Sequence, residues 1–541
     1  MKQYDWRPHC YFKIFDTKVG NKTPNFFVLP ESKIPPPFYR ETYSHHIIGY
    51  FISFTPNITA DLIFEKLTKK DWQFLFSLWA EFLLVVTDKD TGEIFILSDL
   101  YGRLPCYFSL QKDYVSISTD IGLIRDTCLI QSLNLSAVLE HIAHTLYLSS
   151  STLIREIHQA PPGCVIRICH QQRYFEINSV SPQMWSELPH DFPSEQAFLN
   201  EYINVLEKTI EYQMQKVGSS GLRLGAQLSS GLDSSLISYL LKKQQDHLNC
   251  YFLFANIAPT ADDPTTAIQF AEKHNLEVKL FDGSQFFPFS HSEDYQITQT
   301  YPANINPLRG LVSPFHEFIA KDKVDVVWSG EGGNELYRLN RTLKTGRYFF
   351  QLQFFEVVNT VRQRMGEYLT QDGFELLISR ENIINKKVFP SFISPSTVKA
   401  NWADFSNYWA YNLWTINPFQ SPAVINFVQN ATIKSKPILS RKSVLRRWVD
   451  KIYLDKQFTV DSNYDAVIAQ MFMERLDFVT DILQNSVLAD LGLIKNELLL
   501  QRFRQGDISH YYDNGGFVQL HNLIRTEYFI QTNNLHIPTL S

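Results

Sequence analysis

The segment Leu222–Ser235, LRLGAQLSSGLDSS, carries the strongest signal for the fold. Leu222–Leu228 predicts a strand, and Ser234–Lys243 predicts a helix that begins after a turn of small residues. Such a turn presents unpaired backbone N–H groups and the positive end of the helix dipole to an anion. The sequence therefore predicts a phosphate-binding loop at Ser229–Ser235. The alternative is a serine-capped helix start after a glycine turn, which is common in α/β proteins.

Strands and helices alternate in the residues that follow this loop. Cys250–Ala255, Glu277–Phe281 and Val324–Trp328 read as strands, and Thr265–His274 reads as a helix. This alternation predicts a parallel sheet with helices on both faces, in which ligands bind beyond the carboxyl ends of the strands. After residue 340 the sequence becomes long, helical and aromatic.

Short β-rich runs dominate the chain from about residue 46 to residue 168. Phe82–Val86, Glu93–Leu97 and Tyr114–Ser118 are examples, and Asp88–Gly92 between the first two has the composition of a hairpin turn. This part predicts a layered β-sheet domain with a few helices.

A domain boundary is predicted in the Pro- and Ser-rich stretch Ser179–Pro193. We place one domain at residues 1–185 and a second at residues 194–541.

Composition excludes several classes of protein. The 541 residues include 50 Lys and Arg against 56 Asp and Glu, a net charge of −6, so the chain lacks the basic excess of general nucleic-acid binders. Hydrophobic residues make up 44 % of the chain, yet no apolar run approaches the roughly 18 residues of a membrane helix. The first residues lack the apolar segment of a secretion signal, so we expect a cytoplasmic protein without membrane insertion.

The six cysteines and the many aromatic residues have simple interpretations. The cysteines form no CxxC pair or zinc-ligand spacing, which disfavours structural zinc and a disulfide framework. The 41 Phe and 26 Tyr fit either a Phe-rich core or peptide-binding grooves.

The loop Ser229–Ser235 resembles the SGGxDS pyrophosphate loop of ATP pyrophosphatases, with Ser230 at the first glycine position. The resemblance implies that ATP is cleaved between its α and β phosphates, so that a carboxylate becomes an acyl-adenylate and pyrophosphate is released. It implies that Asp233 holds Mg²⁺, and that the nucleotide contacts Ser229, Ser230, Gly231, Leu232, Asp233, Ser234 and Ser235. The GxxxxGK[ST] motif of phosphate-transferring P-loops is absent from the sequence.

A second segment, Val326–Leu336, resembles the SGxGxDEL motif of asparagine synthetases. Further segments similar to that family are Asp263 with Ala267 and Ala271, Asn417-Pro418-Phe419, Lys442 with Leu445-Arg446, Asp99–Tyr107 and Pro162-Gly163. The resemblance covers nearly the whole chain. It implies an α/β protein with an Ntn-type β-sandwich, class II amidotransferase-like N-terminal domain. The second domain would be an adenine-nucleotide α-hydrolase-like synthetase domain with a parallel sheet and a helical C-terminal region.

The same resemblance assigns roles to further residues. Glu331 would take a proton from the attacking amine, and Lys456 would approach the α-phosphate. Gln227, Phe254 and Gly330 would contact the nucleotide. The alternatives are a capping or salt-bridging glutamate at Glu331 and a solvated helix-end lysine at Lys456.

Two residues depart from the family pattern. Lys2 stands where glutamine-using members have their nucleophilic cysteine, and Cys10 would serve only after removal of nine residues, so we expect an N-terminal domain without glutaminase activity. Asn334 replaces an aspartate that helps to bind magnesium, and its amide oxygen is a poorer ligand for this cation. Glu331 or Glu335 could compensate; a partly degenerate site is the alternative.

Without glutamine-derived ammonia, the amine must come with the substrate, as in β-lactam synthetases and lasso-peptide cyclases. β-Lactam synthetases carry a tyrosine at the position of Glu331, whereas Phe478–Ile494 and Leu498–Leu500 resemble the helical extension of lasso cyclases. This resemblance implies a macrolactam-forming cyclase with a precursor peptide and a leader-removing protease as partners. The rivals are an ammonia-dependent asparagine synthetase, a non-catalytic binding scaffold and, third, a tRNA-modifying pyrophosphatase, which the net charge disfavours.

Overall fold

The computed structural model places most of the chain. It describes residues 11–15, 26–28, 37–126, 131–144, 150–180, 190–218, 221–255, 264–286, 301–304, 308–336, 358–378, 395–434, 436–437, 465–508, 516–533 and 535–538.

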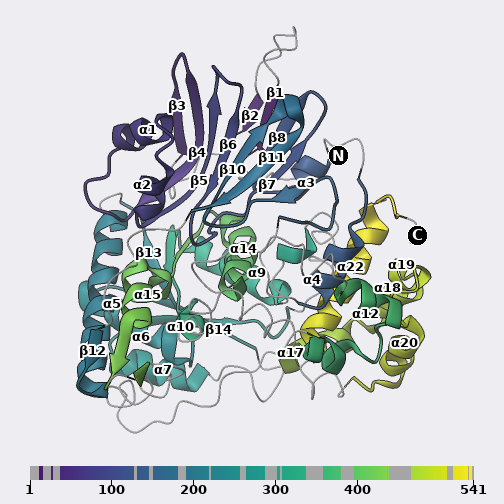
Figure 1. Cartoon of the computed structure of the whole chain (residues 1–541). Coiled ribbons are helices and arrows are strands. Elements are labelled where there is room, and N and C mark those ends of the chain that lie inside the picture. The colour runs from purple at the N-terminus through teal and green to yellow at the C-terminus, as the bar shows by residue number, and fades with distance from the viewer. Residues whose placement is uncertain are drawn as a thin grey trace.

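Two antiparallel sheets form the N-terminal part of the described chain (Figure 1). The first has the order β2-β1-β8-β7-β9, with β1 at Tyr11–Phe15, β2 at Phe26–Val28, β7 at Tyr107–Leu110, β8 at Tyr114–Ser118 and β9 at His158–Gln159. The second has the order β11-β10-β6-β5-β4-β3, with β3 at Pro37–Glu41, β4 at His45–Ser53, β5 at Ala80–Asp88, β6 at Ile94–Ser98, β10 at Cys164–Cys169 and β11 at Tyr174–Ser179. The predicted layered β-sheet region is confirmed.

Burial on both faces explains the sequence of the central strand β5. All nine of its residues are buried, which is why Phe82–Val86 reads as a continuous apolar run rather than an alternating one. The helices of this part are α1 (Ala60–Thr68), α2 (Trp72–Ser77), α3 (Ile121–Arg125) and α4 (Leu135–Ile142). Phe76 of α2 packs edge-on against Phe82, with ring centroids 5.5 Å apart, so α2 covers part of this strand.

A parallel sheet with the order β15-β14-β13-β16-β17 forms the next layer. Its strands are β13 (Leu224–Leu228), β14 (Asn249–Phe254), β15 (Glu277–Asp282), β16 (Val326–Trp328) and β17 (Trp414–Ile416). Its helices are α5 (Glu195–Gly218), α6 (Leu232–Gln244), α7 (Pro264–Lys273), α9 (Arg309–Lys321), α10 (Gly333–Leu336) and α14 (Pro395–Trp409). The strands and helices expected between residues 222 and 328 are therefore confirmed, with bounds shifted by one or two residues.

Two short strands differ from the sequence-based expectation. β17 adds an edge to the parallel sheet within a segment expected to be helical, because three residues are too few to show a period. β12 (His190–Phe192) lies within the predicted linker, where it pairs in parallel with β18 (Ala431–Ile433), and β19 (Lys436–Pro437) pairs with β18 in turn. Residues 190–192 are thus tied to the C-terminal part of the chain.

The C-terminal helices share a second hydrophobic core with α3 and α4. These helices are α12 (Gln371–Ile378), α17 (Asp465–Glu474), α18 (Leu476–Gln484), α19 (Val487–Asp490), α20 (Asn496–Gln505) and α22 (Phe517–Asn533), while α15 (Pro422–Asn430) packs on α5. Asn522 donates to the backbone oxygen of His141 at 3.0 Å, which joins α22 to α4. Figure 1 shows this helical cluster beside α4, on the side of the molecule where the chain ends.

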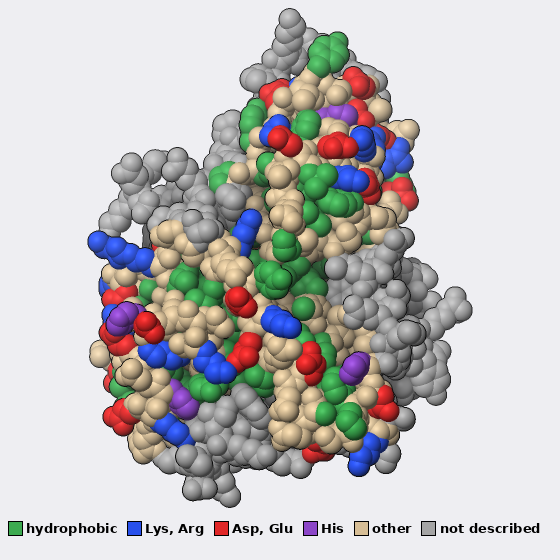
Figure 2. All heavy atoms as spheres, turned by 90° about the vertical axis from the view of Figure 1, so that its left-hand side faces the viewer, with side chains coloured by type: hydrophobic (Ala, Val, Ile, Leu, Met, Phe, Trp, Pro, Cys, Tyr) green, Lys and Arg blue, Asp and Glu red, His purple; other side chains and the backbone are tan. Residues whose placement is uncertain are grey.

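The charge on the surface and the length and polarity of the helices relate to the two classes that composition excludes, general nucleic-acid binders and membrane-spanning proteins. Figure 2 shows lysine and arginine side chains interspersed with aspartate and glutamate over the described part of one face, so this face carries charge of both signs. None of the helices in the described residues is both long enough and apolar enough to cross a bilayer.

Gly49→Ala should strongly destabilise the N-terminal part. A Cβ atom at Gly49 of β4 would lie 2.0 Å from the backbone oxygen of Leu83 in the neighbouring strand, which cannot move without breaking the sheet. We expect a loss of about 3 kcal/mol or more, measured as a lower apparent unfolding temperature. Gly218→Ala is the matched control, because nothing lies within 4 Å of its new methyl group; equal behaviour of the two variants would contradict this account.

Candidate functional site

The turn from β13 into α6 is held in shape by its own serine hydroxyls. The backbone N–H of Ser229 donates to Ser234 Oγ at 3.0 Å, and the two hydroxyl oxygens lie 2.6 Å apart. Ser235 Oγ donates to the backbone oxygen of Ser229 at 3.2 Å, and the N–H of Gly231 donates to Ser229 Oγ at 3.1 Å. These three hydroxyls therefore set the path of the backbone.

The start of α6 is suited to bind an anion. Gly231 is the N-cap residue, and because it has no side chain it makes no side-chain cap bond to the first turn of α6. α6 runs for 13 residues, long enough for its dipole to favour negative charge at this end. Leu232 and Ser234 are buried and anchor the first turn, whereas Ser230 is half-buried and Gly231 is exposed.

The loop after β16 lies directly against this turn. β16 is the neighbour of β13 in the sheet, so the carboxyl ends of the two strands are adjacent. A Cβ atom at Gly330 would lie 2.6 Å from Ser234 N, and one at Gly333 would lie 2.5 Å from Asp233 Cγ. The two segments that the sequence singled out are thus in contact, and at Gly330, which faces the backbone of α6, only glycine permits this approach.

Four carboxylates converge above the two loops. Glu331 follows β16, Asp233 lies in the first turn of α6, Glu335 lies in α10 and Asp404 lies in α14. Desolvation by the surrounding protein, followed by the charges of Asp404, Glu335 and Asp233, raises the pKa of Glu331 to about 8. Burial likewise raises the pKa of Asp404 to about 7, although the charge of Arg103 opposes the shift.

Tyr408 of α14 links this group of carboxylates to β13. Its side chain is hydrogen-bonded to that of Gln227, and burial with the charges of Asp404 and Glu331 raises the pKa of the phenol well above 10. The ring of His316 in α9 stacks on that of Tyr408, with centroids 3.8 Å apart, and burial lowers the pKa of His316 to about 3. A neutral phenol therefore borders the carboxylates, and a neutral imidazole stacks on its ring.

Phe254 and Asn334, two further residues predicted for the site, lie in β14 and α10. Phe254 ends β14, one strand away from β13, and its backbone oxygen accepts from Gly283 N at 2.7 Å. Asn334 is exposed in α10, next to Glu335. Within the described residues, no three His, Cys, Asp or Glu side chains are arranged to hold a metal ion by themselves.

Several predicted residues lie outside the described part of the chain. They are Lys2, Cys10, Asp263, Lys442, Leu445, Arg446 and Lys456.

Sequence reasoning missed Asp404 and Tyr408. Both lie on α14, a helix without a recognisable motif, and only the packing of α14 over the parallel sheet brings them to Glu331. Asn417, in contrast, belongs to the segment Asn417-Pro418-Phe419, whose sequence resembles asparagine synthetases. It directly follows β17, and its amide is hydrogen-bonded to Ser329 Oγ at 2.9 Å.

Comparison with known proteins bears on what this site does. Residues 202–388 match the family described as asparagine synthase, a segment that includes both loops but less than half of the chain. The match indicates an ATP-dependent, amide-forming ligase. The comparison with curated proteins gives no match.

Solved structures with some similarity have low scores. They include the U34-tRNA thiolase NcsA from Methanococcus maripaludis (12 % identity, 48 % of this chain and 81 % of that chain, TM-score 0.20). An allosteric regulatory enzyme of purine biosynthesis shares 8 % identity over 53 % of this chain and 76 % of its own, with a TM-score of 0.22. Glutamine phosphoribosylpyrophosphate amidotransferase from B. subtilis shares 9 % sequence identity over 51 % of this chain and 59 % of its own, with a TM-score of 0.20. Scores this low carry no argument about this chain.

Glu331→Gln should stabilise the fold more at about pH 9 than at about pH 5. The folded pKa of Glu331 is about 8 against an ordinary 4.5, so the unfolded chain releases this proton first as the pH rises. Stability is therefore lost between pH 4.5 and about pH 8, and the amide avoids that loss. We expect a benefit larger by about 1–3 kcal/mol at the higher pH, measured by denaturant unfolding.

Glu211→Gln, on the exposed face of α5, is the control for removal of a carboxylate elsewhere. If Glu331→Gln changed stability equally in both buffers, Glu331 would not have the raised pKa that the neighbouring carboxylates imply.

Proposed function

We propose that this protein is an ATP-dependent macrolactam cyclase of the lasso-peptide type. It would adenylate the side-chain carboxylate of an Asp or Glu in a precursor peptide and join it to the N-terminal amine of the same peptide. The observation that carries the proposal is the contact of the Gly330–Gly333 loop with the start of α6, which places a carboxylate of raised pKa beside an anion-binding helix end. In this proposal, the N-terminal part is an Ntn-type amidotransferase-like domain and the remainder is an adenine-nucleotide α-hydrolase-like synthetase domain.

ATP and Mg²⁺ both fit the residues present. The first turn of α6 would receive the phosphates, with Ser230 and Gly231 at its accessible edge. Four nearby carboxylates would repel a triphosphate, so binding requires a cation to screen them. Magnesium usually takes one or two carboxylates and keeps water or phosphate as its other ligands, which suits Asp233 with Asn334 or Glu335.

The proposed reaction has two steps, adenylation of the carboxylate and formation of the amide. An oxygen of the substrate carboxylate attacks the α-phosphorus, and the bond to the β-phosphate breaks to release pyrophosphate. The amine nitrogen then attacks the acyl carbon, AMP leaves, and the nitrogen loses a proton. The ionised form of Glu331 would accept that proton, because a carboxylate with a pKa of about 8 is a stronger base than an ordinary one.

The helical C-terminal region is the proposed site for the peptide. Phe478–Ile494, the segment similar to lasso cyclases, comprises α18, α19 and the turn after α19, which pack against α20 and α22. Holding both reacting groups of one peptide makes amide formation intramolecular, and well-oriented groups gain as much as about 7–11 kcal/mol in this way. A leader-removing protease would supply the free amine.

An ammonia-dependent asparagine synthetase is the second candidate. The family matched by residues 202–388 favours it directly, and the same adenylation site would serve free aspartate.

The proposal is tested with a series of synthetic peptides that carry a free N-terminal amine and an Asp or Glu at successive positions. We expect ATP- and magnesium-dependent release of AMP and pyrophosphate and the loss of one water from the mass of a peptide with a suitable ring size. The Asp233→Asn variant should release pyrophosphate at least about tenfold more slowly, a loss of about 1.4 kcal/mol in transition-state stabilisation.

N-acetylated peptides and peptides with Asn at the acceptor position are the substrate controls, and neither should cyclise. Conversion of aspartate with ammonium, without any peptide product, would favour the asparagine synthetase candidate. ATP binding without pyrophosphate release under either condition would indicate a binding scaffold.

Asn334→Asp should lower the magnesium concentration needed for half-maximal pyrophosphate release. A charged carboxylate is a stronger ligand for this hard cation than an amide oxygen, so we expect a reduction of about two- to tenfold. Asn200→Asp makes the same chemical change on the exposed face of α5 and should have no effect. An unchanged magnesium requirement in Asn334→Asp would remove residue 334 from the metal site.

A further inference from the structure

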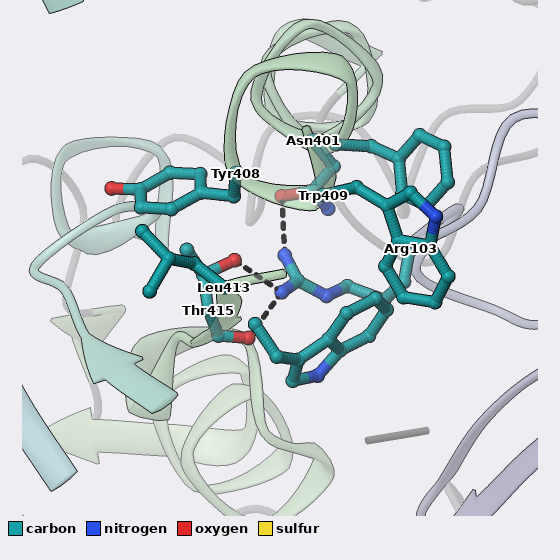
Figure 3. A pocket seen from close by; sticks show the side chains of 8 residues that line it. Arg103, Asn401, Tyr408, Trp409, Leu413 and Thr415 are labelled. Atoms are coloured by element: carbon teal, nitrogen blue, oxygen red, sulfur yellow. Dashed lines mark hydrogen bonds between the residues drawn. The ribbon is translucent and has the colours of Figure 1, made fainter. Parts of the chain in front are cut away.

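Arg103 reaches from the N-terminal part of the chain into the part that carries the candidate site. It lies in the turn between β6 and β7 and is 5 % exposed. Its guanidinium donates to Asn401 Oδ1 at 3.1 Å, to Thr415 Oγ1 at 2.5 Å and to the backbone oxygen of Thr415 (Figure 3). Asn401 belongs to α14 and Thr415 to β17, so the Arg103 side chain joins the turn between β6 and β7 to both of these elements.

Glu81 and Trp414 complete the surroundings of this guanidinium. Arg103 Nε lies 3.4 Å from Glu81 Oε1, and Trp414 Nε1 donates to Glu81 Oε2 at 3.0 Å. The guanidinium carbon lies 5.3 Å from the centroid of the Trp414 ring. A cavity of about 10 Å³, enough for about one water molecule, adjoins these residues.

One chain of hydrogen bonds runs from Arg103 to the backbone of Glu331. With the Asn417 amide oxygen turned toward the arginine, it accepts from Arg103 Nη1 at 3.0 Å, and the amide nitrogen donates to Ser329 Oγ at 2.9 Å. Ser329 Oγ in turn accepts from the N–H of Glu331 at 3.1 Å. Two side chains therefore separate Arg103 from the loop of the predicted proton acceptor.

A second connection reaches the same loop at Gly332. Asn401, which accepts from Arg103, donates to Gln420 Oε1 at 3.0 Å and to the backbone oxygen of Tyr101 at 2.9 Å. Gln420 packs on Gly332, where a Cβ atom would lie 2.8 Å from Gln420 Cγ. Gly332 has a φ of +92°, a conformation open to glycine, and its lack of a Cβ atom lets Gln420 pack directly on its backbone.

Stability alone does not explain a charged residue at this position. Burying an ion pair costs desolvation that its attraction often fails to offset, and apolar replacements of similar volume are often neutral or stabilising. The desolvation of Glu81 is evident in its pKa, which burial raises even though Arg103 and Trp414 oppose the shift. The planar fork of arginine, in contrast, suits a role that fixes several acceptors at defined angles.

We propose that Arg103 is a positioning residue that holds the Ser329–Gly333 loop through Asn417 and Gln420, and so makes the N-terminal part necessary for the chemistry of the other part. The kinetic consequence rests on the proposed function, whereas the ordering of the loop does not. Without Arg103, Asn417 and Asn401 each lose a hydrogen-bond partner, so both supports of the loop weaken and Glu331 is held less firmly.

The test compares the full-length wild type with Arg103→Met, Arg103→Lys and Asn417→Leu. The control is Arg167→Met, which removes an arginine paired with Glu93 on the surface of the N-terminal part. The double variant Glu81→Gln/Arg103→Met removes both buried charges, so that no carboxylate is left unpaired if Arg103→Met folds poorly. The first readout is hydrogen exchange at the amides of residues 329–333, and the second is the steady-state kinetics of pyrophosphate release.

We expect about tenfold or faster exchange at residues 329–333 in Arg103→Met, the double variant and Asn417→Leu, with wild-type exchange in Arg167→Met. The kcat of pyrophosphate release should fall at least tenfold while the KM for ATP changes less than twofold, and added guanidinium should restore part of the kcat of Arg103→Met. Arg103→Lys should stay impaired, because an ammonium cannot reproduce the fork.

Unchanged exchange at residues 329–333 in both the double variant and Asn417→Leu would overturn the proposal. If the wild type releases no pyrophosphate, the proposed function fails while the exchange data still decide the role of Arg103. A loss of kcat with unchanged exchange would also contradict positioning of the loop.

Discussion

The close approach of two backbone segments, at the carboxyl ends of β13 and β16, is the constraint on which the site depends. Gly330 and Gly333 have no Cβ; a methyl group at Gly330 would overlap the backbone of the first turn of α6, and one at Gly333 would displace the Asp233 carboxylate. The approach brings Glu331 beside Asp233 and leaves the helix end accessible at Ser230 and Gly231. Backbone contact fixes these positions more precisely than side chains can, because side chains have alternative rotamers.

The first half of the site could be read from the sequence, because its signals are local. The strand β13, the turn and α6 follow one another without interruption, and the small residues of the turn indicate the tight path that the structure shows. The contact between the two loops was implied by placing both at strand ends, although the sequence alone did not give the neighbouring order of β13 and β16. The β-sheet character of the N-terminal part was likewise evident from the runs that form β5, β6 and β8.

The remaining features depend on contacts between residues far apart in the chain. Asp404 and Tyr408 approach Glu331 only because α14 packs over the sheet, and nothing around them in sequence marks a site. β17 is too short to show a period, and it is recognised only by its pairing with β16. The turn that contains Arg103 was noted in the sequence, but its partners lie about 300 residues further along the chain.

The four carboxylates near the start of α6 repel one another and any bound phosphate, and the residues around them reduce this repulsion. Four acidic side chains near the start of α6 oppose the binding of any phosphate there, unless some are protonated or screened. Burial raises the pKa of Glu331 and of Asp404, which favours their neutral forms and so reduces the negative charge of the group. The charge of Arg103 opposes the neutralisation of Asp404, so the arginine proposed to support the loop also favours the ionised form of this neighbouring carboxylate. Geometry and charge at the site are therefore both coupled to the N-terminal part of the chain.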